Sequence, residues 1–156
     1  MKTQFSIIVV SLFFYCSLTY AQWVQTSLTS SRVNTILVSN ANLFAGTHSN
    51  GIFISTDNGL NWSAVNNGLT TSRVHGLAIS GTNLFAGTYG GGVFRSTDNG
   101  ASWNTANNGV TNPYVLTFAV SDTNIFAGTE PQGGGKLFRS TNNDSNWNLA
   151  DNGIPS

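Results

Sequence analysis

A pattern of 41 residues occurs three times in succession, and it constrains the fold more than any other feature of the chain. Phe44, Phe85 and Phe126 hold equivalent positions in the three copies. Each copy contains strand-forming residues, a Phe-Ala-Gly-Thr segment and a turn-forming segment that leads to a Trp. Repeats of roughly 40 to 50 residues with this content are typical of propeller blades, which are four-stranded sheets stacked on one another. The repeat therefore predicts an all-β partial propeller of three four-stranded blades in an open arc.

The same period places the domain boundaries. We expect a signal peptide at 1–21, an orphan outer strand with a linker at 22–32, and blades at 33–73, 74–114 and 115–156. Propellers usually close with about four to eight blades. A fourth blade at this spacing would begin just beyond Ser156. We therefore interpret the sequence as part of a longer propeller, and its expected partners include further blades of the same chain or a second copy.

The first residues have the layout of a secretory signal peptide. Lys2 precedes an apolar run from Phe5 to Leu18, and Thr19-Tyr20-Ala21 provides a cleavage site. The run is short and contains several serines, which argues against a membrane span. We expect a secreted or otherwise extracytoplasmic protein, at the cell surface or in the periplasm, that does not insert into the membrane after cleavage.

The charge balance excludes one class of partner. Six Lys and Arg residues balance six Asp and Glu residues, and charged residues make up only 8% of the chain. No basic surface for nucleic acid is predicted. The single cysteine, Cys16, lies in the predicted signal peptide, so the sequence after it offers neither a disulfide nor a thiolate metal site.

Within one copy, the pattern predicts four strands. In the first copy these are Val33 to Ser39, Leu43 to Thr47, Gly51 to Ser55 and a short strand that begins at Trp62. The first strand is apolar on both faces, which is typical of a strand sandwiched between two sheets. The Ala-Gly pair of the second strand is small enough to let a neighbouring blade approach closely.

A turn with a defined chemistry separates the third and fourth strands. Asp57 can accept hydrogen bonds from backbone N–H groups that follow it, and Gly59 supplies a positive φ. Trp62 is then expected to cover the hairpin with its ring. The complete set of turn positions is Ser55, Asp57, Gly59 and Trp62; Ser96, Asp98, Gly100 and Trp103; and Ser140, Asn142, Asp144 and Trp147. In the third copy Asn replaces Asp and Asp replaces Gly, so that turn is expected to be weaker.

These turns resemble the Asp-box, or bacterial neuraminidase, repeat, whose pattern is Ser/Thr-x-Asp-x-Gly-x-x-Trp. Two copies match it fully and the third in part, and the resemblance extends over residues 33 to 150. It implies a propeller similar to those of sialidases, xyloglucanases, sortilin-type receptors and photosystem II assembly factors. Because these families include hydrolases and plain binding scaffolds, the resemblance indicates the fold and leaves the activity open.

One end of the blades carries the candidate binding residues. In a blade, the loop between the second and third strands shares a face with the linker to the next blade, and the box turns lie on the opposite face. His48, Tyr89 and Glu130 occupy the same loop position and differ, although the residues around them repeat. The candidates for binding carbohydrate or protein on this face are His48, Asn50, Tyr89, Glu130, Gln132, Arg32, Arg73, His75 and Tyr114.

The same residues argue against catalysis. A glycosidase needs two carboxylates about 5 to 9.5 Å apart. Asp57 and Asp98 are used in turns, and Glu130 has no visible partner on its face. His48 and His75 lie in different blades without a nearby carboxylate, so we expect no metal and no cofactor. The leading hypothesis is a secreted, non-catalytic binding or scaffold module. The alternatives are part of a sialidase- or xyloglucanase-like glycoside hydrolase whose catalytic residues lie in missing blades, and an assembly factor for a membrane complex.

Overall fold

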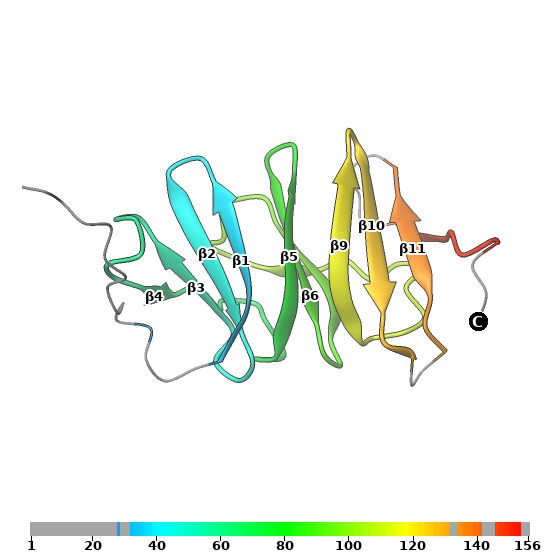
Figure 1. Cartoon of the computed structure of the whole chain (residues 1–156), viewed down its shortest axis with the longest axis horizontal. Helices are drawn as coiled ribbons and strands as arrows, with labels where there is room; N and C mark the ends of the chain where they lie inside the picture. Colours follow the sequence, from blue (N-terminus) through cyan, green and yellow to red (C-terminus); the bar gives the residue numbers. More distant parts are fainter. Residues whose placement is uncertain (1–27, 29–31, 132–133, 142–145, 154–156) are drawn as a thin grey trace, which may run out of the picture.

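The computed structural model describes residues 28, 32–131, 134–141 and 146–153, and these form three antiparallel sheets without an α-helix (Figure 1). Each sheet has four strands in chain order, and we call the sheets blades 1, 2 and 3. Blade 1 consists of β1 (Val33–Ser39), β2 (Asn42–Thr47), β3 (Ile52–Ser55) and β4 (Ser63–Ala64). Blade 2 consists of β5 (Val74–Ser80), β6 (Asn83–Thr88), β7 (Gly92–Ser96) and β8 (Asn104–Thr105). Blade 3 consists of β9 (Val115–Ser121), β10 (Asn124–Thr129), β11 (Leu137–Ser140) and β12 (Asn148–Leu149). The predicted all-β fold class is confirmed, and each outermost strand begins one residue after its Trp instead of at it.

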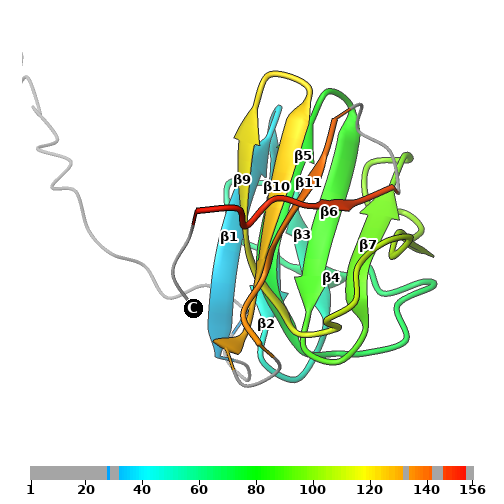
Figure 2. The ribbon, with the colours of Figure 1, turned by 90° about the vertical axis from the view of Figure 1, so that its right-hand side faces the viewer.

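The blades stack face to face in chain order. Strand β5 contacts β1 on one side and β9 on the other, and the blades overlie one another when viewed along the stack (Figure 2). The core between blades 1 and 2 contains Phe44, Ile52, Val74, Leu84, Ala86, Phe94 and Trp103. The core between blades 2 and 3 contains Ala78, Phe85, Val93, Ala106, Val115, Ile125, Ala127, Phe138 and Trp147. Burial between blades is therefore the main stabilising term, since each interface removes large apolar side chains from water.

Glycines on the second strands set the spacing of the blades. A Cβ on Gly46 would lie 2.7 Å from Val74 Cγ1 of blade 2, and one on Gly87 would lie 2.8 Å from Val115 Cγ1 of blade 3. Real Cβ atoms do not approach this closely, so the backbones can meet only because these side chains are missing. The close approach expected from the Ala-Gly pairs is confirmed.

The sequence predicts that the first strand of each blade is sandwiched between two sheets, and the structure differs from this prediction. In blade 1, Ile36 and Val38 are 64% and 63% exposed. Their equivalents in blade 2, Leu77 and Ile79, pack against the core between blades 1 and 2. The expectation is wrong for blade 1, and also for blade 3, where Ala119 and Val120 of β9 are exposed, because no described sheet covers the outer face of either blade.

The turn between the third and fourth strands, called the box turn (55–62 and 96–103), has the expected geometry. Ser55 Oγ donates to Asp57 Oδ1 at 2.8 Å and accepts from the Gly59 N–H at 2.8 Å. Asp57 Oδ1 also accepts from the backbone N–H of Asn61 at 2.9 Å. Gly59 has φ 88°, and Asn58 before it has φ 58°, so two successive residues adopt the left-handed conformation. The turn is thus closed by one serine and one carboxylate acting together.

The second box turn repeats this network around Asp98. Its carboxylate accepts from the Ser102 hydroxyl and backbone N–H and from the Ser96 hydroxyl, and these bonds lower its pKa to about 2. Gly100 has φ 86°. In the third copy Ser140 is fully buried, whereas Asn142 and Asp144 lie outside the described residues.

The box tryptophans join neighbouring blades. Trp103 Nε1 donates to the Val65 carbonyl of blade 1 at 2.9 Å, and Trp147 Nε1 donates to the Ala106 carbonyl of blade 2 at 2.8 Å. The expectation that each ring covers its own hairpin is wrong for these two, because the rings enter the core shared with the preceding blade. Trp62 differs: it is half-buried, and its Nε1 donates to Gly59 of its own turn at 3.0 Å.

Candidate functional site

The loops between the second and third strands lie beside the linkers, as expected. The backbone N–H of His48 donates to the Arg32 carbonyl at 2.8 Å, and that of Tyr89 donates to the Arg73 carbonyl at 2.9 Å. In blade 3, the N–H of Glu130 donates to the Tyr114 carbonyl at 2.9 Å. Each variable loop residue is therefore held next to a linker residue at the same end of its blade.

Side chains from blade 1, from blade 2 and from the linker to blade 3 meet at this end. The ring centroids of His48 and His75 are 6.4 Å apart, those of His75 and Tyr89 5.8 Å, and those of Tyr89 and Tyr114 4.6 Å. The charged residues Arg32, Arg73 and Glu130 lie beside these rings. We call this set the rim row: Arg32, His48, Arg73, His75, Tyr89, Tyr114 and Glu130.

The two arginines of the rim row lie against its rings. Arg73 places its guanidinium carbon 4.0 Å from the centre of the Tyr89 ring, a cation–π contact. Arg32 Nη2 lies 3.1 Å from His48 Nδ1, and Arg32 Nε donates to Asn34 Oδ1 at 3.2 Å. Asn34 in turn donates to the Val74 carbonyl of blade 2 at 2.8 Å. The positive charge of the rim is thus fixed to blades 1 and 2.

Two polar atoms in the rim row have no hydrogen-bond partner among the described residues. They are Arg73 Nε and His75 Nε2, and both are shielded from solvent. Arg73 Nε is a donor in every protonation state, and His75 Nε2 is a donor in one neutral tautomer and in the imidazolium. An unpaired buried donor costs free energy that an acceptor on a ligand can recover.

The electrostatics of the row follow from this crowding. Desolvation, followed by the nearby guanidinium groups, lowers the pKa of His75, and the same causes lower the pKa of His48. A hydrogen bond with the Glu130 carboxylate raises the pKa of Tyr89. At neutral pH both histidines are therefore uncharged.

The structure corrects one inference made from the sequence. His48 and His75 lie in different blades and yet are neighbours, because the blades stack closely at this end. Glu130 lies close to the Tyr89 hydroxyl and raises its pKa, and this contact supplies no second carboxylate. Among the described residues, no group of three His, Cys, Asp or Glu side chains could hold a metal ion.

Not every predicted residue joins the row. Asn50 lies in the loop after His48, where its N–H donates to Thr47 Oγ1 at 3.0 Å. Gln132 lies outside the described residues. The roles of all these candidates stay predictions.

Sequence reasoning missed a pair of asparagines that shape the loops. Asn66 Oδ1 accepts from the Ile52 N–H at 2.7 Å, and its Nδ2 donates to the Asn50 carbonyl at 3.0 Å. Asn107 makes the same bonds in blade 2, to Val93 and Gly91 at 2.6 and 2.9 Å. The signal was the Asn-Asn-Gly triplet at 66–68 and 107–109, which recurs with the period of the repeat.

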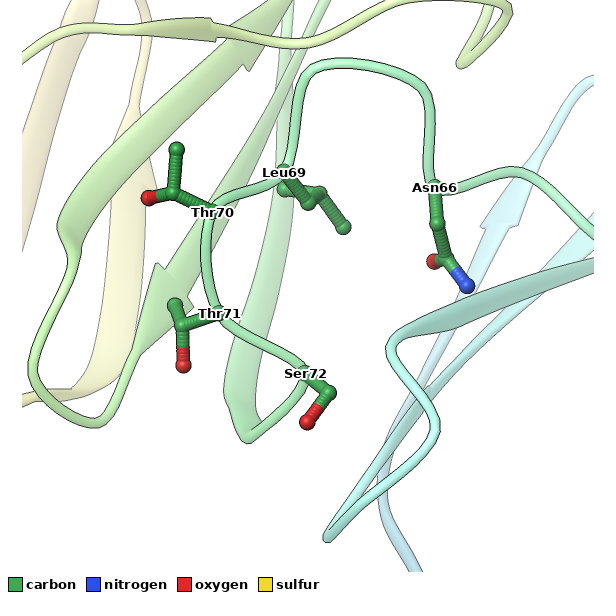
Figure 3. Close-up of a pocket in the computed structure, with 5 residues that line it drawn as sticks. All are labelled: Asn66, Leu69, Thr70, Thr71 and Ser72. Carbon is green, nitrogen blue, oxygen red and sulfur yellow. The ribbon is translucent and has the colours of Figure 1, made fainter.

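A shallow hollow of about 310 Å³ lies beside the first of these asparagines (Figure 3). It is lined by Asn66, Leu69, Thr70, Thr71 and Ser72 of the linker. The Asn66 amide is already used by the loop, so the hollow offers mainly hydroxyl groups.

Solved structures similar to this chain are propeller proteins. An ancestral GH74 enzyme matches 83% of this chain and 20% of its own, with TM-score 0.65 and 20% identity. YCF48 bound to D1 peptide matches 85% of this chain and 44% of its own, with TM-score 0.66 and 18% identity. YCF48 from Cyanidioschyzon merolae matches 78% and 38%, with TM-score 0.60 and 20% identity. The chain thus has a propeller-like fold and spans less than half the length of these proteins.

No protein-family model and no curated protein matches the sequence. Within the described residues, no helix has the length and the apolar character needed to cross a membrane.

Proposed function

We propose that this chain is part of a secreted, non-catalytic Asp-box propeller that binds a polypeptide carrying a carboxylate on its rim row. The observation that supports the proposal is the meeting of Arg73, His75 and Tyr89, which brings together two buried polar atoms without a partner, Arg73 Nε and His75 Nε2. Arg and Tyr are, together with Trp, the residue types enriched at binding hot spots. A carboxylate suits the donors because it accepts several charge-assisted hydrogen bonds.

The geometry favours a polypeptide over a sugar. The Tyr89 ring is in contact with Arg73, His75 and Tyr114, so little of it is free to act as a flat platform for a sugar ring. The likeness to YCF48 bound to D1 peptide supports a peptide ligand by analogy of fold. A role in assembling a membrane complex follows from that analogy alone.

A glycoside hydrolase is the second candidate, and the likeness to an ancestral GH74 enzyme favours it. In this reading the catalytic residues lie in blades beyond the described ones. Among the described residues, Glu130 is the carboxylate of the rim row, and its hydrogen bond to Tyr89 supports a structural use. A pair of acids at the spacing that hydrolysis needs is not found in this part of the rim.

Selection from a displayed random-peptide library tests the proposal. We expect enrichment of Asp- and Glu-rich peptides, whose affinity falls about tenfold or more in Arg73→Gln, since a charge-assisted bond contributes about 1.5 to 3 kcal/mol. Arg139→Gln is the matched control, because Arg139 is an exposed arginine of β11 outside the rim row. A glycan array is probed in parallel. Binding of neutral oligosaccharides without any acidic peptide would contradict the proposal.

A further inference from the structure

Blades 1 and 3 each expose one half of the joint that connects neighbouring blades inside the chain. In the internal joints, a Trp from one blade enters a socket in the linker of the preceding blade. Trp103 meets the socket of blade 1, and Trp147 meets the socket of blade 2. Because the repeat continues through all three blades, blade 3 has an equivalent socket and blade 1 has an equivalent Trp.

The socket has three parts. A carbonyl at Val65 or Ala106 accepts from the indole Nε1–H. A carbonyl at Asn67 or Asn108 accepts from the backbone N–H of the same Trp, at 2.9 and 2.8 Å. A glycine follows, Gly68 or Gly109, where a Cβ would lie only 2.0 Å from the carbonyl oxygen of that Trp.

Blade 3 presents the same socket, and no described residue occupies it. Its equivalent residues are Ala150, Asn152 and Gly153. Gly153 has φ 86°, and the glycines of the occupied sockets have φ 87° and 89°. No atom of the residues that the structure describes lies within 4 Å of a Cβ built on Gly153. The backbone is therefore already in the conformation that accepts a Trp.

Blade 1 presents the complementary half. Trp62 is half-buried and uses its Nε1–H within its own turn. Val33 is 37% exposed, whereas its equivalents Val74 and Val115 are fully buried in the internal joints. Ile36 and Val38 are exposed as well, and their equivalents in blade 2 pack against blade 1. An apolar face of this kind has the surface chemistry of an inter-blade interface.

We propose that two copies of this chain join head to tail, with Trp62 of each copy in the blade 3 socket of the other, so that the three described blades of each copy together form a six-bladed ring. The outer face of blade 1 and the socket side of blade 3 are complementary because they carry the residues equivalent to those in contact at the internal joints. Head-to-tail contacts form a closed ring when the rotations between successive copies add up to a full turn. Six blades lie within the usual range of about four to eight for propellers. The rim rows of both copies would then lie on one face of the ring.

Cysteine cross-linking tests the joint directly. In the internal joint between blades 2 and 3, Asn108 and Asn146 form a backbone bridge and hydrogen-bond through their side chains. The equivalent residues across the proposed joint are Asn152 and Asn61. Chains with Asn61→Cys and chains with Asn152→Cys, both in a Cys16→Ser background, are mixed and oxidised. We expect a covalent dimer in the mixture and none in either variant alone. No dimer in the mixture would overturn the proposal.

Light scattering on the purified chain provides the second measurement. We expect the mass of two chains, shifted to one chain by Ile36→Lys, which places a charge in the joint. Leu60→Lys is the matched control, because Leu60 is 63% exposed on the same blade. Its equivalent Ala101 stays exposed beside an internal joint, so this variant should remain dimeric. A monomer at every concentration, open-ended larger species, or a dimer that survives Ile36→Lys would each overturn the ring.

Discussion

Replacing the box tryptophans one at a time should produce unequal losses of stability. Trp103 is 2% exposed and lies in the core between blades 1 and 2. A buried Trp removes on the order of 200 Å² from water, which corresponds to about 5 kcal/mol at 25 cal/mol per Å². Trp103→Ala should therefore lower the free energy of unfolding by about 3 to 5 kcal/mol. Trp62→Ala should cost about 1 to 2 kcal/mol, because this ring is half-buried and bonds within its own turn.

A conservative variant separates the hydrogen bond from the packing. Trp103→Phe keeps an aromatic ring but leaves the Val65 carbonyl without its donor, at a cost of about 1 to 3 kcal/mol. The assay is urea unfolding followed by far-UV circular dichroism, at protein concentrations low enough to keep the chain monomeric. Equal losses for Trp62→Ala and Trp103→Ala would refute the assignment of Trp103 as an inter-blade plug.

Three further outcomes are expected. Gly87→Ala should lower the free energy of unfolding by about 1 to 3 kcal/mol, because the new Cβ would lie 2.8 Å from Val115 Cγ1; a wild-type melting temperature would contradict this. The contribution of Asp98 to stability is complete above pH 3.8 and is lost as the pH falls to about 2, so Asp98→Asn should flatten stability over that acid window. The lowered pKa of His48 and His75 means that the unfolded chain binds protons first, so stability should fall as the pH drops below 6.5; chemical denaturation of the His48→Gln/His75→Gln variant should show a smaller fall.

The box turn could be predicted in detail because its chemistry is local. Ser55, Asp57 and Gly59 lie within five residues, so chain geometry alone brings the hydroxyl and the carboxylate to the right N–H groups. The partner of Trp103 could not be predicted in this way, since the Val65 carbonyl lies 38 residues earlier in another blade. Which carbonyl a ring reaches depends on how two sheets pack, and the repeat pattern does not specify that.

In the rim row, too, the sequence predicts local placement but not the contacts between blades. Strand order placed His48 and His75 at one end of their blades, and the structure agrees. Their contact depends on the distance between blades, which Gly46 helps to set by allowing Val74 of the next blade to approach closely. The sequence places the two histidines on separate blades, and only the stacking of the blades brings their rings together.

An NMR titration with a hexaglutamate peptide tests the rim row most directly. We predict saturable shifts of the Arg73 side-chain Nε–H and of the backbone amides of His48 and Tyr89, which lie at the unpaired buried atoms of the rim row or beside them. The amides of Gly59 and Gly100, in the box turns, should not move. Shifts confined to the box turns, or no shift at the rim at any peptide concentration, would contradict carboxylate binding at the rim row.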